Sequence, residues 1–163
     1  MANSITLRTV TPEDQDLLFR VFSSTRVDEL ALTDWDQGQI HEFLHMQFRA
    51  QSQHYQNTFP HASYDIVQND GRAVGRLSID RNPVEIRILD IALLPEARGR
   101  GIGTALLRSL LAEGEFGGTP IRIHVEKFNP ALRWYQRLGF ELVSDTGVYL
   151  AMEWNHLSPR MPQ

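Results

Sequence analysis

The hydrophobic positions of the chain follow two periods. Alternation of apolar and polar residues predicts strands over residues 5–10, 63–68, 73–80 and 121–125, and a denser apolar run predicts a central strand over 84–94. Apolar residues three and four apart predict amphipathic helices from 12 to about 23 and from 36 to about 57. A leucine-rich helix then follows residue 101, and a short helix follows Asn129 and Pro130.

Turn signals separate these segments. Residues 69–71 (Asn-Asp-Gly) and 145–147 (Asp-Thr-Gly) lie between paired apolar runs, the second pair being 140–143 and 148–154, and both indicate hairpins. The resulting order is β-α-α-β-β-β-α-β-α-β-β. It predicts an α/β fold in which a mixed, mostly antiparallel sheet of about seven strands carries four helices on both faces. We expect one domain over residues 1–157 and a loose tail over 158–163.

Residues 95–104 (Pro-Glu-Ala-Arg-Gly-Arg-Gly-Ile-Gly-Thr) join the central strand to the leucine-rich helix. A glycine-rich turn at a helix N-terminus presents several backbone N–H groups to a ligand, which favours an anion such as a phosphate. The turn lacks the Lys-Ser/Thr pair of a nucleotide-hydrolysing P-loop, and its glycines at 99, 101 and 103 do not match a dinucleotide fingerprint. We therefore expect neither ATP or GTP hydrolysis nor dinucleotide binding.

Composition excludes several further classes. The chain of 163 residues has no Cys, which removes disulfides, thiolate nucleophiles and cysteine-based zinc sites. Its net charge of −4 and its single lysine, Lys127, argue against nonspecific nucleic-acid binding. No apolar stretch reaches the roughly 20 residues of a membrane-spanning helix, and the first residues do not resemble a signal peptide. We expect a cytoplasmic protein that binds neither nucleic acid nor a membrane.

Acidic residues outnumber basic ones over residues 13–42, where only Arg20 and Arg26 oppose them. A solvated helix face explains such an excess, and the alternative is a groove that attracts a cationic amine. The acidic residues of this set are Glu13, Asp14, Asp16, Asp28, Glu29, Asp34, Asp36 and Glu42.

Two motifs resemble those of the GNAT family of N-acetyltransferases. Residues 98–103 (Arg-Gly-Arg-Gly-Ile-Gly) resemble the family's Arg/Gln-x-x-Gly-x-Gly/Ala segment, and residues 129–140 resemble its short helix that carries a Tyr and ends in Gly-Phe. The similarity is clear over residues 74–154. It implies that the turn binds the pyrophosphate of acetyl-CoA, that main-chain groups of the preceding strand bind the pantetheine arm and thioester carbonyl, and that Asn129 contacts the pantetheine. The residues so assigned are Ile91, Ala92, Leu93, Arg98, Gly99, Arg100, Gly101, Ile102, Gly103 and Asn129.

The same resemblance assigns Tyr135 as the acid. A phenol with a pKa of about 10 stays protonated at neutral pH and can protonate a thiolate whose thiol has a pKa of about 8.5. By spacing alone, Tyr135 is also a good core residue on a helix face with Ala131 and Leu138. Asn129 has an alternative role too, since Asn before Pro130 is a typical helix N-cap.

The base that accepts the amine proton is open among three side chains and water. His124 resembles a catalytic strand position of ribosomal-protein acetyltransferases, and its imidazole suits an amine proton. Asp90 shares a strand face with apolar residues, which would raise its pKa, or it serves as a structural hydrogen-bonding group. Glu85 is the third candidate. The remaining histidines lack the pattern of a ligand set, although His41 and His45 lie one helical turn apart, and we assign no metal.

These residues predict an acetyl-CoA-dependent N-acetyltransferase. Without a cysteine for an acetyl-enzyme route, we expect direct transfer to a primary amine in a ternary complex. The acceptor is a small-molecule or peptide amine, and a cationic one if the acidic residues line its groove. The oligomeric state is open between a monomer and a homodimer. The alternative from another class is a catalytically silent acyl-CoA-binding regulatory or interaction module.

Overall fold

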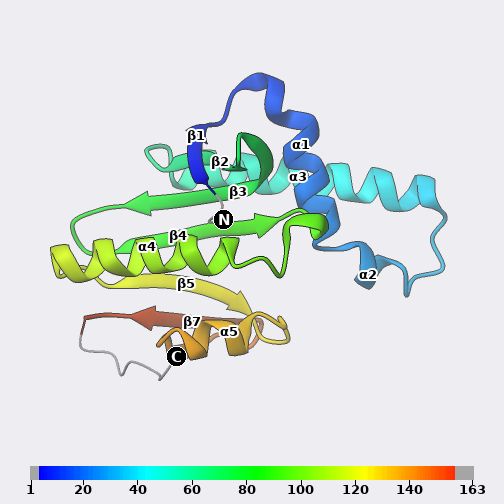
Figure 1. The fold of residues 1–163 in the computed structure, drawn as a ribbon. Helices are drawn as coiled ribbons and strands as arrows, with labels where there is room; N and C mark the ends of the chain where they lie inside the picture. The colour runs from blue at the N-terminus through cyan, green and yellow to red at the C-terminus, as the bar shows by residue number, and fades with distance from the viewer. Residues whose placement is uncertain (1–3, 157–163) are drawn as a thin grey trace. The chain divides into compact units, whose positions relative to one another are not determined.

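The computed structural model describes residues 4–156 (Figure 1). Its strands are β1 (Ile5–Thr9), β2 (Ser63–Asn69), β3 (Arg72–Arg81), β4 (Ile86–Leu93), β5 (Ile121–Glu126), β6 (Glu141–Asp145) and β7 (Tyr149–Trp154). Its helices are α1 (Gln15–Ser24), α2 (Val27–Leu30), α3 (Gln37–Thr58), α4 (Ile102–Gly117) and α5 (Leu132–Arg137), with 3-10 turns η1 (Pro12–Asp14) and η2 (Pro95–Ala97). The seven strands form one sheet in the order β1-β2-β3-β4-β5-β7-β6. The predicted α/β fold and the order of its elements are confirmed.

The helices differ from the prediction in three places. α2 is a single turn that was not predicted, so the described residues contain five α-helices rather than four. α4 runs from Ile102 through Gly117, past the Gly-Gly-Thr-Pro signal at 117–120 that predicts a loop from Gly117 onward. α5 begins at Leu132, and its N-cap is Ala131 rather than Asn129. Asn129 nevertheless accepts a hydrogen bond from the Ala131 N–H through its Oδ1 at 2.8 Å, so its side chain does stabilise the approach to the helix.

Contacts divide the described chain into two compact units. The first contains residues 4–78 together with Asp90–Gly103, and the second contains Ile79–Leu89 together with residues 104–156. The single domain expected over residues 1–157 stays a prediction, and the tail expected over 158–163 lies outside the described residues.

The core of the first unit lies between α1, α3 and β2. Its buried members are Leu18, Phe22, Leu44, Phe48 and Ile66. The four members on α1 and α3 are spaced by four residues within each helix, as the sequence predicted, so the apolar face of each helix is its buried face.

An ion pair between Arg8 and Asp14 links β1 to the 3-10 turn before α1. Both carboxylate oxygens of Asp14 accept hydrogen bonds from the Arg8 guanidinium at 2.8 Å, and one of them also accepts from the Thr11 N–H. These bonds hold the pKa of Asp14 far below its ordinary value of 3.8. Asp14 is buried and its carboxylate is hydrogen-bonded to Arg8 and Thr11, so it does not line the acidic groove that the sequence suggested.

In the second unit, α4 packs its leucines inward and comes close to the chain after it. Leu106, Leu107 and Leu110 are buried. A Cβ on Gly114 would lie 2.7 Å from the Thr119 carbonyl oxygen, so glycine is required where the helix crosses the loop that leads to β5. β5 pairs with β7 in antiparallel register and with the start of β4 in parallel register.

Candidate active site

The turn between β4 and α4 has the backbone that an anion-binding loop needs. Gly99 and Gly101 have φ angles of 73° and 80°, in the left-handed region that favours glycine. Apart from the adjacent residues of the chain, no heavy atom lies within 4 Å of the position that a Cβ would occupy at either residue, so the space beside the main chain is open. Ile102 begins α4 and is 1% exposed, which anchors the turn to the core below it.

The turn also offers several backbone donors. The first N–H groups of α4 have no intrahelical acceptor, as at every helix N-terminus. Among the described residues, no carbonyl accepts a hydrogen bond from the N–H groups of Gly99, Arg100 or Gly101. Several consecutive N–H groups are thus available to one anion, beside the positive end of a helix of 16 residues.

Arg98 and Arg100 differ in what their side chains do. Arg98 donates from Nε to the Leu93 carbonyl oxygen at 3.0 Å and from Nη2 to the Ser24 hydroxyl at 3.2 Å. It therefore fixes the end of β4 against α1. Arg100 is exposed, which leaves its charge available to a ligand phosphate.

The segment Ile91, Ala92 and Leu93 ends β4. The pairing of β4 with β5 covers Ile86–Ile88 and Ile121–Ile123, at the start of each strand, so this segment lies beyond the paired part. On the β3 side the approach is tight, because a Cβ at Gly75 would overlap the Ala92 carbonyl oxygen. Gly75 was not singled out from the sequence. Its signal there is an isolated glycine inside a strand pattern, which often marks a close backbone approach.

Tyr135 lies on α5 and is 5% exposed. Its ring contacts Phe140 edge to face, with centroids 5.7 Å apart. α5 ends as the sequence suggested: Gly139 has φ 101°, and the N–H groups of Gly139 and Phe140 donate to the Gln136 and Tyr135 carbonyls. This cap fixes the end of the short helix and with it the phenol.

A second contact fixes the start of the same helix. The Trp134 indole Nε1–H donates to the Thr104 hydroxyl at 3.1 Å. Thr104 lies in the first turn of α4, so α5 is tied to the helix that follows the glycine-rich turn. Spacing in the sequence could not show this bond, because the two residues are 30 positions apart.

His124 lies on β5 and has a cationic partner on the neighbouring strand. Arg87 Nη2 lies 2.7 Å from His124 Nδ1. Partial burial, followed by the Arg87 charge, lowers the pKa of His124, and the charge of Glu85 opposes this change. The ring is therefore neutral at physiological pH.

The other two candidate bases are held in ion pairs. Asp90 Oδ2 lies 2.8 Å from Nε of Arg76, whose side chain is buried. Glu85 lies 3.1 Å from the Arg122 guanidinium, which also contacts Glu153 at 3.3 Å. The ion pair with Arg76 thus gives Asp90 the structural role that the sequence left as the alternative to catalysis.

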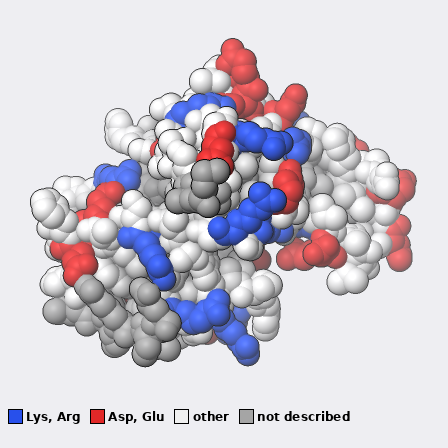
Figure 2. Space-filling model, in the orientation of Figure 1, with Lys and Arg blue, Asp and Glu red and all other residues white. Residues whose placement is uncertain are grey.

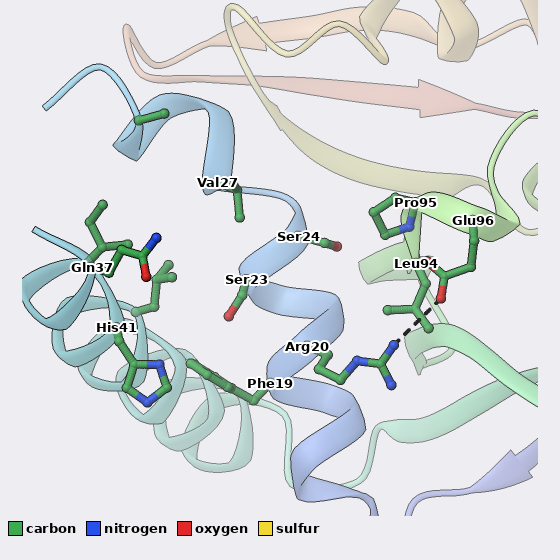
Figure 3. A pocket seen from close by; sticks show the side chains of 13 residues that line it. Phe19, Arg20, Ser23, Ser24, Val27, Gln37, His41, Leu94, Pro95 and Glu96 are labelled. Carbon is green, nitrogen blue, oxygen red and sulfur yellow. Dashed lines mark ion pairs between the residues drawn. The ribbon is translucent and has the colours of Figure 1, made fainter.

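A cavity of about 620 Å³ lies within the first unit (Figure 3). We call it the α1–α3 cavity. Its walls are mainly apolar, and Figure 3 shows Phe19 and His41 facing each other from α1 and α3. The Arg20–Glu96 ion pair, 3.6 Å long, crosses one side. The lining residues are Phe19, Arg20, Ser23, Ser24, Val27, Ala31, Gln37, Ile40, His41, Leu44, Leu94, Pro95 and Glu96.

Residues 27–42, several of which line this cavity, also carry exposed acidic side chains. Asp28, Glu29, Asp34 and Glu42 are exposed, and residues 27–42 contain no Lys or Arg. Figure 2 shows acidic side chains gathered over α2 and the start of α3. Asp36 belongs to the same stretch, but one of its carboxylate oxygens caps α3 by accepting from the Gln39 N–H.

Two histidines of α3 pack against aromatic rings. His45 stacks on Phe19 with centroids 3.7 Å apart, and His41 meets His45 edge to face. Within residues 4–156, no group of three or more His, Asp or Glu side chains could hold a metal ion. Over the same residues, no helix combines the length and apolar character needed to cross a membrane.

Comparison with known proteins assigns the chain to a family of acyl-CoA-dependent acyltransferases. The chain belongs to the acetyltransferase (GNAT) family, whose model matches residues 25–140. It is therefore an acetyltransferase of class EC 2.3.1, and the enzymes of this family use acetyl-CoA. No curated protein sequence matches the chain.

Solved structures share the whole fold at low sequence identity. The PaiA N-acetyltransferase of Thermoplasma acidophilum, solved with coenzyme A, has a TM-score of 0.69 and 19% identity over 93% of this chain and 99% of its own. An acetyltransferase of Thermus thermophilus has a TM-score of 0.67 and 22% identity over 93% of this chain and 97% of its own. The ribosomal-protein-S18-alanine N-acetyltransferase of Escherichia coli has a TM-score of 0.61 and 16% identity over 98% of this chain and 97% of its own.

Proposed function

We propose that this protein transfers the acetyl group of acetyl-CoA directly to a primary amine in a ternary complex. The observation that carries the proposal is the turn of residues 98–103. Its two left-handed glycines, its open flank and its free N–H groups fit the doubly charged pyrophosphate of coenzyme A. In this proposal the main chain of Ile91–Leu93 binds the pantetheine arm, and Asn129 contributes a contact beyond its bond to Ala131.

The chemistry requires two proton movements. The neutral amine forms a C–N bond to the thioester carbonyl carbon as the C–S bond breaks, and the nitrogen then loses one proton to a base. The departing thiolate takes one proton from an acid, for which we propose the Tyr135 hydroxyl. The buried, capped position of Tyr135 supports this role, since a fixed phenol requires little reorganisation during the reaction.

The base is chosen among His124, Asp90, Glu85 and water. His124 is neutral at physiological pH, as a base must be. Asp90 and Glu85 are carboxylates that their arginine partners hold in place. A carboxylate in an ion pair keeps further lone pairs for a proton, whereas a neutral imidazole has only one.

For the acceptor, we propose a cationic amine with an apolar body. The α1–α3 cavity supplies apolar walls, and the acidic residues of α2 and α3 supply a field that attracts positive charge. Acetylation should therefore be faster with aromatic or aliphatic diamines than with monoamines of the same size, which lack the second positive charge. The rate advantage should fall as salt rises, because the acids are exposed and screened.

The experiment measures thiol release from acetyl-CoA over a panel of amines at two salt concentrations. Intersecting double-reciprocal plots are expected, because direct transfer requires both substrates to be bound together. Parallel plots would contradict direct transfer, and faster acetylation of monoamines without salt dependence would contradict the electrostatic argument. Coenzyme A binding without turnover on any amine would instead favour a silent acyl-CoA-binding module.

The homodimer and the cytoplasmic location stay predictions. Size-exclusion chromatography with light scattering tests the first. β6 is an edge strand whose five residues are all exposed, which makes it the first surface to examine if a dimer is found.

A further inference from the structure

In the contact between Arg87 and His124, the chemistry of the two side chains determines which one donates the hydrogen bond. β4 and β5 run parallel with Arg87 opposite Arg122, which brings the Arg87 side chain beside the next outward residue of β5, His124. Arg87 Nη2 and His124 Nδ1 are 2.7 Å apart. A guanidinium has only donors, so Nδ1 must be the acceptor in this bond.

This direction determines where the imidazole proton lies. A neutral imidazole carries one N–H and one lone pair. Because the lone pair on Nδ1 accepts from Arg87, the single proton lies on Nε2. Nε2 can then donate a hydrogen bond, but it has no lone pair with which to accept a proton from an amine.

We propose that Arg87 is a positioning residue that holds His124 as the neutral Nε2–H tautomer, and that His124 donates a hydrogen bond to a substrate oxygen instead of acting as the base. The inference rests on the proposed function for the identity of the reaction. It leaves the amine proton to a carboxylate or to ordered water, and it makes a carbonyl or carboxylate oxygen the expected partner of His124.

The charges that face His124 agree with this arrangement. Partial burial has the largest effect on the imidazole and lowers its pKa. The charge of Arg87 from β4 lowers the pKa further, and the charge of Glu85, from the segment before β4, raises it. Arg122 on β5 is occupied by Glu85 and Glu153. Opposite His124, β7 places the uncharged Ala151, and along β5 the two neighbours on the same face are Arg122 and Glu126.

A direct test is the tautomer itself, read from long-range ¹H–¹⁵N correlation spectra of the His124 ring in the full-length protein. The wild type should show one protonated nitrogen, Nε2, at pH values above the His124 pKa. Arg87→Met keeps a chain of similar length without donors, so it should allow both tautomers and raise the pKa of His124. Arg87→Lys should restore the Nε2–H form. A wild-type ring protonated on Nδ1, or a pKa unchanged in Arg87→Met, would overturn the proposal.

Kinetics separates a donor from a base. The Gln side-chain N–H₂ reaches about as far as an imidazole Nε2–H but accepts no proton, whereas the shorter Asn amide lies nearer the Nδ1 position. His124→Gln should therefore keep kcat/KM within a few-fold of the wild type. His124→Ala and His124→Asn should each lower it about tenfold, the value of one lost hydrogen bond. Equal losses in all three variants would contradict the proposal, because a donor role requires His124→Gln to be the most active of them. The spectra need no turnover, so they report on the tautomer even if the proposed reaction is wrong.

Discussion

At the scale of single residues, the Tyr135 hydroxyl is the proposed general acid. Tyr135→Phe keeps the ring that packs against Phe140 and removes only the donor. Coenzyme A affinity and melting temperature should change little, while kcat falls about 10²-fold or more, as for other general acids. The measurement is kcat together with a coenzyme A titration. An unchanged kcat with chemistry shown to be rate-limiting would assign the proton to another group.

The contacts of some single residues could be predicted from the sequence, and those of others could not. The motif around Tyr135 was sufficient to predict a short helix, its Gly139 cap and the buried phenol. The partners of His124, Asp90 and Asp14 were not predictable. Each ion pair or hydrogen bond depends on strand register or on the path of a loop, and Arg87 lies 37 positions from His124. Charge counting therefore included Asp14 in a groove, whereas Arg8 holds it in the core.

At the scale of elements, the turn before α4 makes the most specific prediction. Gly101→Val places a β-branched side chain at φ 80°, in space that we assign to the pyrophosphate. The variant should lose the stabilisation that coenzyme A gives to the wild type. Differential scanning fluorimetry with and without coenzyme A measures this loss.

Gly118→Val is the matched control for backbone strain. Gly118 has φ 64° and open space beside it, but it lies between α4 and β5 and outside the turn. Both variants should melt at lower temperature than the wild type, since a left-handed conformation costs about 1–2 kcal/mol for a residue with a Cβ. Only Gly118→Val should keep the coenzyme A shift. If Gly101→Val keeps it too, the turn does not bind the pyrophosphate.

The elements themselves were largely predictable because their periods are clear. The strands follow alternation or a dense apolar run and the longer helices follow three-to-four spacing, and Asp70 and Gly71 adopt the positive φ values that a tight hairpin requires. α2 was missed because a single helical turn has no period to detect. The start of α5 was placed early because Asn129 and Pro130 carry helix-start signals that the chain uses in the turn just before the helix.

At the scale of the whole molecule, the fold and the family establish acyl transfer from coenzyme A esters, and the acceptor depends on features that no motif encodes. The α1–α3 cavity is built from α1, α2, α3 and residues 94–96, which are far apart in the sequence. Apolar spacing predicted the core-facing sides of α1 and α3 but not that their ends leave a cavity. The acceptor preference is therefore a prediction from shape and charge rather than from a residue pattern.

Binding of coenzyme A is tested most directly by the melting temperature of the wild-type protein with and without millimolar coenzyme A. A ligand that binds only the folded state stabilises it by about 2.7 kcal/mol at a hundredfold excess over its dissociation constant. For a chain of this size that corresponds to a rise of roughly 5 °C or more. The account predicts this rise, and a similar one with acetyl-CoA. An unchanged melting temperature with both ligands would contradict it.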